Sequence, residues 1–311
     1  MTAVLYVFVY AALVVFVVAS AVRAVLYARM PMHLRWELYP VPHEPHERLK
    51  HGGSYLEVPD WWTEPRHVNR VAEVGWMARE ILLLKGLWDA NRRLWFRSFP
   101  FHFGLYLLFG SAGLLVLAGI RTLGAPDAPA TPIGQVLRAA YLVTGAAGLA
   151  LGIAGAASLL HRRLTDATLR NYTTPADLFN LLFFIASFGL LGAGFLARPA
   201  GSPGPLALVV GLLTFDTQLP VPSLLAAGVI VASLLVGYIP LTHMSHYVAK
   251  YFTYHYVRWD DAPAHGNRAL AARVAEYLAY RPTWSAPHVT ADGRRTWGEV
   301  ATTNPAQGTQ K

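Results

Sequence analysis

The chain has 311 residues, of which 54% are hydrophobic and only 14% are charged, and its formal net charge at pH 7 is +8. This composition is typical of a protein with several membrane spans and one modest soluble extension. Cysteine is absent, which excludes disulfides, thiolate-ligated clusters and covalently attached c-type haem. Any metal must therefore use His, Met or carboxylate ligands, and the 12 histidines make His the natural candidate.

Five apolar segments approach the length of about 20 residues that is needed to cross the hydrocarbon core of a bilayer. In chain order they are Val4–Tyr27, Phe99–Gly119, Gly134–Leu160, Ala176–Leu196 and Pro222–Tyr247. We therefore predict an all-α membrane protein built as a five-transmembrane-helix bundle. The first segment is too long for a cleavable signal peptide and lacks a basic region before it. A further apolar stretch, Leu206–Phe215, is too short to span and is predicted to be interfacial or re-entrant.

Basic residues predict the orientation of these spans. With the N-terminus outside, the inner side receives eleven Lys and Arg between residues 29 and 97, three between 162 and 170, and eight from Lys250 onward. The outer side receives only Arg121, Arg138 and Arg198. The positive-inside rule therefore predicts a periplasmic N-terminus and a cytoplasmic C-terminus. The excess of positive charge needs no nucleic acid, because a basic cytoplasmic face next to anionic lipid or an acidic partner explains it.

Three segments lie outside the predicted four-helix haem-binding membrane core of residues 99–250, and the first of them, residues 1–29, is the first transmembrane helix. Residues 30–98 form a cytoplasmic loop, whose first half is rich in Pro, Gly, Trp and Tyr and is predicted to be irregular structure at headgroup level. Its second half, residues 65–97, has apolar residues at helical spacing among Arg and Lys, which predicts an amphipathic helix for the membrane surface or a partner. Residues 251–311 form a polar cytoplasmic tail with a short helix around Asn267–Tyr280.

Three histidines in the cytoplasmic loop, His43, His46 and His51, raise the question of a zinc site. The zinc-protease pattern needs two His four apart on a helix, with a Glu between them. Here His43 and His46 are three apart, and Pro45 between them would break such a helix. A polar loop is therefore favoured over zinc chemistry.

Two histidines on different spans are predicted to share one depth in the membrane. His102 lies about one turn inside the cytoplasmic end of the second span, and His246 lies in the last turns of the fifth. Ionisable residues within spans are rare enough to indicate function. Two imidazoles that face each other across a bundle are the axial ligands of a six-coordinate haem b. The alternative is that these histidines anchor helix ends at the interface or bond carbonyls.

Other polar residues near this depth are candidates for supporting roles. His243 lies three residues before His246, so only one of the two should bind iron, and the other bonds a propionate or a quinone carbonyl or sits at the interface. His161 is a weaker ligand candidate, for which an interfacial role is favoured. Four basic residues are candidate counter-charges for the haem propionates, although ordinary positive-inside flanks explain them equally well: Arg97, Arg162, Arg163 and Lys250.

The segment LLHRRLTDATLRNYTTPADLFNLLFF resembles the membrane cytochrome b (gamma) subunit of respiratory nitrate reductases. That family carries a similar Arg-Arg-Leu, Arg, Thr-Thr and Ala-Asp sequence between its third and fourth spans. The resemblance covers roughly Phe99 to Tyr251. Within it, His102 and His246 match the family's inner-haem ligands, and Pro240, six residues before His246, matches its proline.

The family binds two haems, and the chain departs from that pattern. The positions that match the family's two ligands of the other haem are Ala112 on the second span and Gly228 on the fifth. Neither residue can bind iron, so one haem is expected. The cytoplasmic loop with RWELYPVPHE and KHGGSYLEVPDWW is more similar to membrane subunits that accompany iron–sulfur proteins of the heterodisulfide reductase type. This resemblance implies a cytoplasmic iron–sulfur partner and a bacterial or archaeal cytoplasmic membrane.

We therefore expect an electron-transfer subunit, rather than an enzyme by itself, that connects menaquinone or ubiquinone to a cytoplasmic iron–sulfur oxidoreductase through one bis-histidine haem b. The quinone would be an exchangeable substrate, and its pocket could use any of several residues: Tyr106, Tyr247, Tyr251, His243 and Lys250. The main alternative is a cofactor-free membrane anchor that docks a soluble enzyme. A transporter is less well supported, because the span centres are apolar and small.

Overall fold

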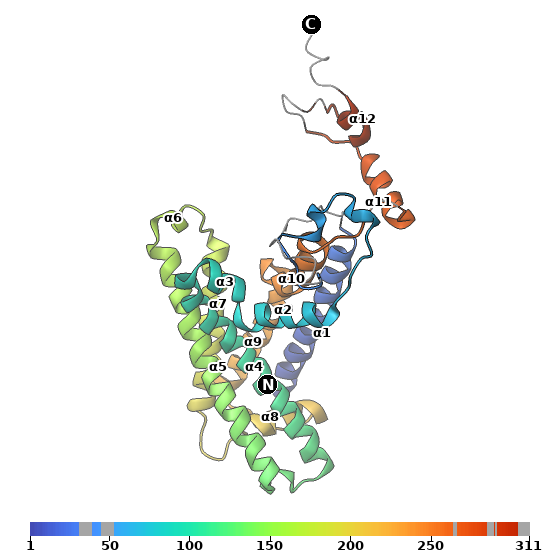
Figure 1. The fold of residues 1–311 in the computed structure, drawn as a ribbon. Helices are drawn as coiled ribbons and strands as arrows, with labels where there is room; N and C mark the ends of the chain where they lie inside the picture. The colour runs from blue at the N-terminus through green and yellow to red at the C-terminus, as the bar shows by residue number, and fades with distance from the viewer. Residues whose placement is uncertain (31–38, 45–52, 264–265, 285–288, 290, 304–311) are drawn as a thin grey trace. The chain divides into compact units, whose positions relative to one another are not determined.

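The computed structural model describes residues 1–30, 39–44, 53–263, 266–284, 289 and 291–303 of the chain. The described residues divide into two compact units (Figure 1). Unit 1 comprises Met1–Arg23 and Val74–Tyr247, and unit 2 comprises Ala24–Glu73 and Val248–Lys311.

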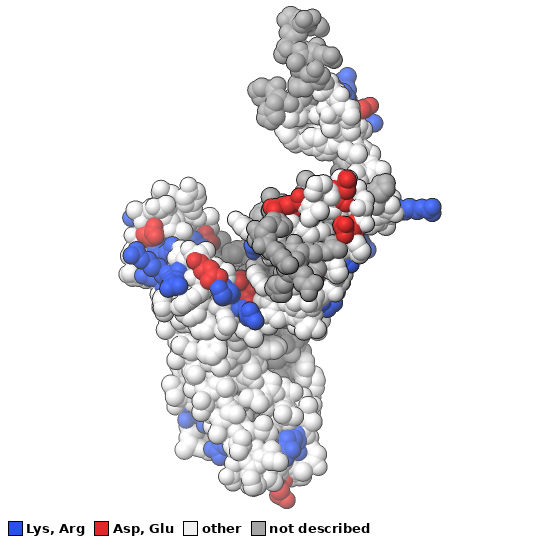
Figure 2. All heavy atoms as spheres, viewed as in Figure 1, with Lys and Arg blue, Asp and Glu red and all other residues white. Residues whose placement is uncertain are grey.

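Five helices of the structure are long and apolar enough to cross a membrane, which confirms the predicted number and order of spans. They are α1 (Thr2–Ala28), α4 (Arg92–Gly124), α5 (Pro132–Thr165), α7 (Pro175–Leu196) and the segment Ser223–Leu241, which comprises α9 (Ser223–Tyr238) and the 3₁₀ turn after it. Figure 2 shows, on the face in view, a band without charged side chains across unit 1 and charged side chains at its two ends. The chain is thus built as a multi-pass membrane protein.

Local sequence explains where the central helices begin. Thr131 is the N-cap of α5 and its hydroxyl accepts a hydrogen bond from the N–H of Gly134, while a proline occupies the first helical position. Thr174 and Asp177 form a capping box at the start of α7, again with a proline first. These caps satisfy N–H groups that have no partner inside their own helix.

Glycines allow the spans of unit 1 to pack backbone against backbone. A Cβ built on Gly104 of α4 would lie 2.5 Å from the backbone nitrogen of Gly152 of α5, and one built on Gly155 would lie 2.4 Å from that of Phe101. Both distances are too short for a real side chain. Small residues at such crossings are the usual means of helix association in lipid, where apolar side chains gain little from mutual burial.

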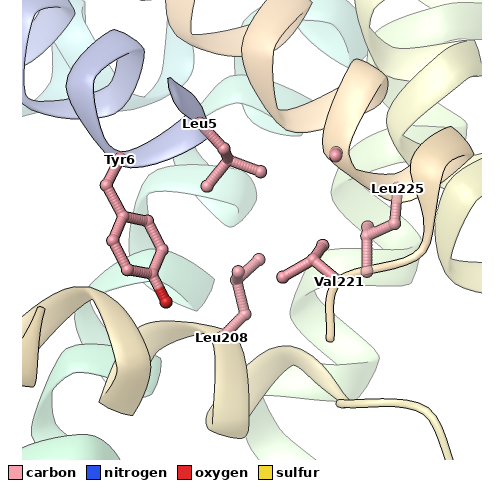
Figure 3. Close-up of a cluster of buried hydrophobic side chains, with 6 residues drawn as sticks. Leu5, Tyr6, Leu208, Val221 and Leu225 are labelled. Atoms are coloured by element: carbon pink, nitrogen blue, oxygen red, sulfur yellow. The ribbon is translucent and has the colours of Figure 1, made fainter. Parts of the chain in front are cut away.

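The short apolar helix α8 (Pro205–Thr214) packs in the interior of unit 1. Its Leu208 belongs to a buried cluster with Leu5 and Tyr6 of α1 and Leu225 of α9 (Figure 3). The hydroxyl of Tyr6 also donates to the backbone oxygen of Asp216, at 3.0 Å, just after α8. The stretch is therefore a packed helix too short to span, held from one side by α1.

The predicted amphipathic helix over residues 65–97 is wrong as a single element. The structure has α2 (Arg70–Leu83), then α3 (Lys85–Ala90), and then α4, which already begins at Arg92. Leu84 between the first two adopts left-handed backbone angles (φ 50°, ψ 48°), and the Glu80 carboxylate accepts a hydrogen bond from Gly86 N at 2.6 Å across this turn. The hydrogen bond to the Glu80 side chain thus competes with continuation of α2 into α3.

The predicted fifth span is also interrupted, because it is not a continuous helix to Tyr247. After α9 come two 3₁₀ turns, η5 (Ile239–Leu241) and η6 (His243–Ser245), and then α10 (His246–Phe252). Pro240 has no N–H to continue the helical pattern. Thr242 is extended (φ −114°, ψ −177°), and its hydroxyl accepts a hydrogen bond from the N–H of Met244. His243 and His246 therefore follow a break rather than lie in the last turns of one helix.

Unit 2 contains shorter elements. The predicted tail helix is confirmed as α11 (Arg268–Leu278), whose N-cap is Asn267. The remaining elements of the chain are turns and single short helices: η2 (Tyr55–Glu57), η3 (Trp61–Thr63), η4 (Ala128–Ala130), α6 (Ala167–Arg170), the π-helical η7 (Thr253–Arg258) and α12 (Trp297–Thr302). Of these, η4 and α6 belong to unit 1.

Candidate functional site

The structure brings the two predicted ligand histidines of unit 1 together. The ring centroids of His102 on α4 and His246 at the start of α10 lie 6.1 Å apart, and their planes make an angle of 62°. A metal bound by two imidazole nitrogens at about 2 Å each holds those nitrogens about 4 Å apart, with each ring centroid farther back. The observed separation is thus of the size that a shared metal between the rings requires.

The hydrogen bond of His102 fixes its tautomer. Its Nδ1 lies 2.8 Å from the backbone oxygen of Ser98, one helical turn earlier. A carbonyl oxygen can only accept, so this contact requires a proton on Nδ1, and in the neutral imidazole the lone pair is then on Nε2. The Ser98 hydroxyl also lies 3.3 Å from Nδ1. Metal-bound histidines use this arrangement, in which the nitrogen away from the metal donates to a carbonyl or carboxylate. The adjacent Phe101 is buried and packs edge-on against the imidazole, with ring centroids 5.4 Å apart.

The segment that carries His246 is held in place by α1. The backbone oxygens of Pro240 and Leu241, at the break after α9, both accept hydrogen bonds from the Arg23 guanidinium at 3.3 Å. Oγ of Ser20 lies 2.5 Å from the hydroxyl oxygen of Tyr247. Helix breaks leave carbonyls without intrahelical partners, and α1 supplies some of these partners. Sequence reasoning did not reveal this role of Arg23, because the contact joins segments 217 and 218 residues apart.

Three predicted counter-charges have partners within unit 1. Arg97 donates to the backbone oxygen of Ser158 at 3.1 Å. Nε of Arg162 lies 3.8 Å from an Asp166 carboxylate oxygen, and Arg163 lies 3.4 Å from Asp177. Arg97 thus joins α4 to α5, Arg162 makes a local contact at the end of α5, and Arg163 joins α5 to α7. The predicted role of these arginines at haem propionates stays a prediction.

The other predicted site residues have varied surroundings. His243 is exposed on η6, and His161 is exposed near the end of α5. The Lys250 ammonium, which belongs to unit 2, lies 6.0 Å from the ring centroid of Tyr254. Among the candidate quinone residues, the Tyr106 hydroxyl donates to the backbone oxygen of Ile81 at 2.6 Å, and Tyr251 stacks on His255 with centroids 4.2 Å apart.

A buried ionic cluster in unit 2 was missed by sequence reasoning, which placed His43 in a polar loop. His43 is only 5% exposed, and its Nε2 lies 2.8 Å from a carboxylate oxygen of Asp261. The same oxygen accepts a hydrogen bond from the Tyr55 hydroxyl at 2.7 Å, and the other oxygen accepts one from Arg66 at 2.6 Å. His43 and Asp261 are 218 residues apart, so no local spacing could have revealed the contact.

The electrostatics of this cluster favour the charged form of Asp261. Burial, the largest single influence, raises its pKa, but hydrogen bonds from His43 and Tyr55 and the charges of His43 and Arg66 together lower the pKa to about 2. On its other side, Nδ1 of His43 lies 3.2 Å from a carboxylate oxygen of Glu73 but makes no hydrogen bond. The cluster is therefore a carboxylate–imidazole–carboxylate arrangement that stabilises unit 2.

Within the parts of the chain that the structure describes, no group of three or more His, Asp or Glu is placed to hold a metal ion. His46 and His51 lie outside the described residues.

The chain matches no family model, no curated protein and no solved structure.

Proposed function

We propose that the protein is a membrane cytochrome b that binds one haem b through His102 and His246 and carries electrons between a quinone and a cytoplasmic iron–sulfur protein. The observation that carries this proposal is the 6.1 Å separation of two imidazoles from elements far apart in the sequence. Ionisable side chains that meet at the end of an apolar bundle are functional candidates by default.

The residues around the pair fit a haem in two respects. The donor set is two imidazoles, and the Ser98 carbonyl holds His102 in the tautomer of a metal ligand. When bound, the haem would supply a one-electron carrier, and His102 and His246 would hold it. Arg23 and Ser20 hold the His246 segment in position through their bonds to the region of the break.

Helix packing supports a single haem per chain. The resemblance to two-haem subunits assigns the second ligand positions to Ala112 and Gly228. Ala112 is exposed on the surface of α4, and a Cβ built on Gly228 of α9 would lie 2.8 Å from the Cα of Leu191 of α7. A histidine at position 228 would force these two helices apart, so this crossing requires glycine rather than a ligand.

The proposed orientation places the pair near the cytoplasmic surface. Positive-inside asymmetry puts the N-terminus outside and the start of α4, which carries His102, inside. A soluble iron–sulfur protein would then dock on the basic cytoplasmic side, and its docking face would be acidic. In this orientation Arg97, Arg162, Arg163 and Lys250 lie on the side to which haem propionates would point.

A cofactor-free anchor subunit is the second candidate function. It is favoured by the contacts of Arg97, Arg162 and Arg163, each of which has a partner within the protein without any bound group. In that case the basic surface docks a soluble enzyme, and the two histidines serve only to join helix ends.

A visible spectrum of the purified protein separates these two functions. The cytochrome predicts a dithionite-reduced alpha band of haem b and a pyridine haemochrome ratio near one haem per chain. A colourless preparation, from cells that supply haem to a control cytochrome, would support the anchor. A ratio near two would contradict the single-haem assignment and would point to His161 or His243 as a further ligand.

A further inference from the structure

A cavity of about 510 Å³ lies at the end of unit 1 opposite to that of His102 on helix α4. It is bounded by α4, η4, α5, the segment after α7 and the start of α8. Three arginines line it, Arg121 from α4, Arg138 from α5 and Arg198 after α7. They are the three basic residues that the predicted topology places outside, and no Asp or Glu is among the described residues that line the cavity. The described residues that line the cavity thus include three positively charged side chains and no negatively charged one.

Arg121 has an unsatisfied donor in this cavity. Its Nε is buried and has no hydrogen-bond partner. A buried donor of a charged group that stays unsatisfied costs free energy, so such groups nearly always have a partner. Arg198, in contrast, donates one hydrogen bond to the backbone oxygen of Phe195, at 2.7 Å. Arg121 thus contributes a positive charge to the cavity lining and has one donor that the protein itself leaves without an acceptor.

The N-terminus of α8 adds a second source of positive potential. Its N-cap is Gly204, which provides no side-chain cap, whereas α5 and α7 have threonine caps. Leu206 and Ala207, in the first turn of α8, line the cavity. The first N–H groups of a helix have no intrahelical acceptor and carry the positive end of its dipole, so they favour anions. The buried cluster around Leu208 fixes this helix end in place (Figure 3).

The apolar side chains of the cavity narrow the class of anion. Leu137, Leu142, Leu206 and Val210 line it beside the arginines. Arginine forks match the oxygens of phosphate, and the apolar walls match the glycerol and first acyl carbons of a lipid. We infer that this cavity binds the phosphodiester headgroup of an anionic phospholipid from the adjacent leaflet. This site is independent of the haem proposed above.

Native mass spectrometry of the detergent-solubilised full chain tests the inference. Phosphatidylglycerol, phosphatidylcholine and inorganic phosphate are titrated separately against the native protein and the variants Arg121→Gln and Arg138→Gln. Phosphatidylglycerol should bind in preference to phosphatidylcholine, and each variant should weaken its binding by about tenfold, as expected for loss of a charge-assisted hydrogen bond. Arg170→Gln, an equal charge change at the exposed end of α6, is the matched control and should leave binding unchanged.

A variant that keeps every arginine separates loss of the lipid site from misfolding of the arginine variants. Ala207→Trp should fill the cavity mouth and exclude the lipid, and its melting temperature and haem content show whether the fold is intact. Inorganic phosphate bound in an Arg121-dependent manner without phosphatidylglycerol would overturn the lipid assignment and support a free-anion site. Equal phosphatidylglycerol binding by native protein, cavity variants and the Arg170→Gln control would overturn the site altogether.

Discussion

The two histidine sites of this protein use the same side chain in opposite ways. In unit 1, His102 donates from Nδ1 to a backbone carbonyl, and its ring faces a second imidazole 6.1 Å away. In unit 2, His43 lies between the carboxylates of Asp261 and Glu73 at 2.8 and 3.2 Å. A carbonyl partner fixes the tautomer and favours metal binding, whereas carboxylates on both sides make the imidazole an ion-pair partner. The neighbours of a histidine, more than its position in a motif, decide its role.

This comparison predicts that substitutions at the two sites change different observables. Variants at the His102–His246 pair should alter the haem spectrum with modest effects on stability. Variants in the Asp261 cluster should alter stability and leave the spectrum unchanged.

The largest stability effect is expected for His43→Ala. The substitution leaves the Asp261 carboxylate buried without one of its partners, and breaking a buried ion pair in this way costs about 3–5 kcal/mol. The free energy of unfolding of the full chain in mixed micelles should fall by an amount of this order, with the alpha band retained. His67→Ala, at an exposed position of unit 2, is the control. If both variants unfold like the native protein, the cluster does not stabilise unit 2.

Acid should weaken the same cluster. The pKa of Asp261 is about 2 in the folded chain, below its ordinary value of 3.8. The stabilisation, about 2 kcal/mol, is therefore fully present above pH 4 and is lost as the pH falls from about 4 to about 2. Melting temperatures measured over this range should fall more steeply for the native protein than for Asp261→Asn. If the melting temperatures of the two proteins fall in parallel with pH, protonation of Asp261 is not the cause of the loss of stability.

An intermediate effect is expected for Arg23→Met at the other site. The variant removes the donors to the Pro240 and Leu241 carbonyls, and each hydrogen bond from a charged group contributes about 1.5–3 kcal/mol. The His246 segment should lose its fixed position, so haem should dissociate faster in a transfer assay to apomyoglobin. Arg29→Met, a substitution of the same kind after α1, should leave the dissociation rate unchanged. Equal rates for all three proteins would show that α1 does not hold the ligand segment.

The smallest effect is expected at the basic surface. Arg92→Glu with Arg93→Glu should weaken association with an acidic iron–sulfur partner severalfold at low salt, because exposed charges are screened beyond a Debye length of about 8 Å at physiological salt. The haem spectrum should be unchanged. If native and variant protein bind the partner equally strongly, the docking surface lies instead in the tail after Tyr251.

The sequence predicted the five spans because long apolar runs are a strong and local signal. The break between Tyr238 and His246 was missed, since Ile239, Leu241 and Met244 extend the apolar run beyond α9 and only Pro240 marked the position. The break at Leu84 depends on a left-handed residue and a Glu80 side chain, which no periodicity reveals. The His102–His246 pair was predictable from depth and opposite helix directions. The His43–Asp261 contact and the support from Arg23 join distant segments and could be found only in the folded chain.

The most direct test of the central claim is the reduced visible spectrum of single histidine variants. His102→Ala and His246→Ala should each abolish the low-spin spectrum of haem b, because each removes one axial ligand. His243→Ala, three residues away on η6, should keep it. The account would be contradicted if removal of His243 abolished the spectrum while removal of His246 did not, or if the native protein contained no haem.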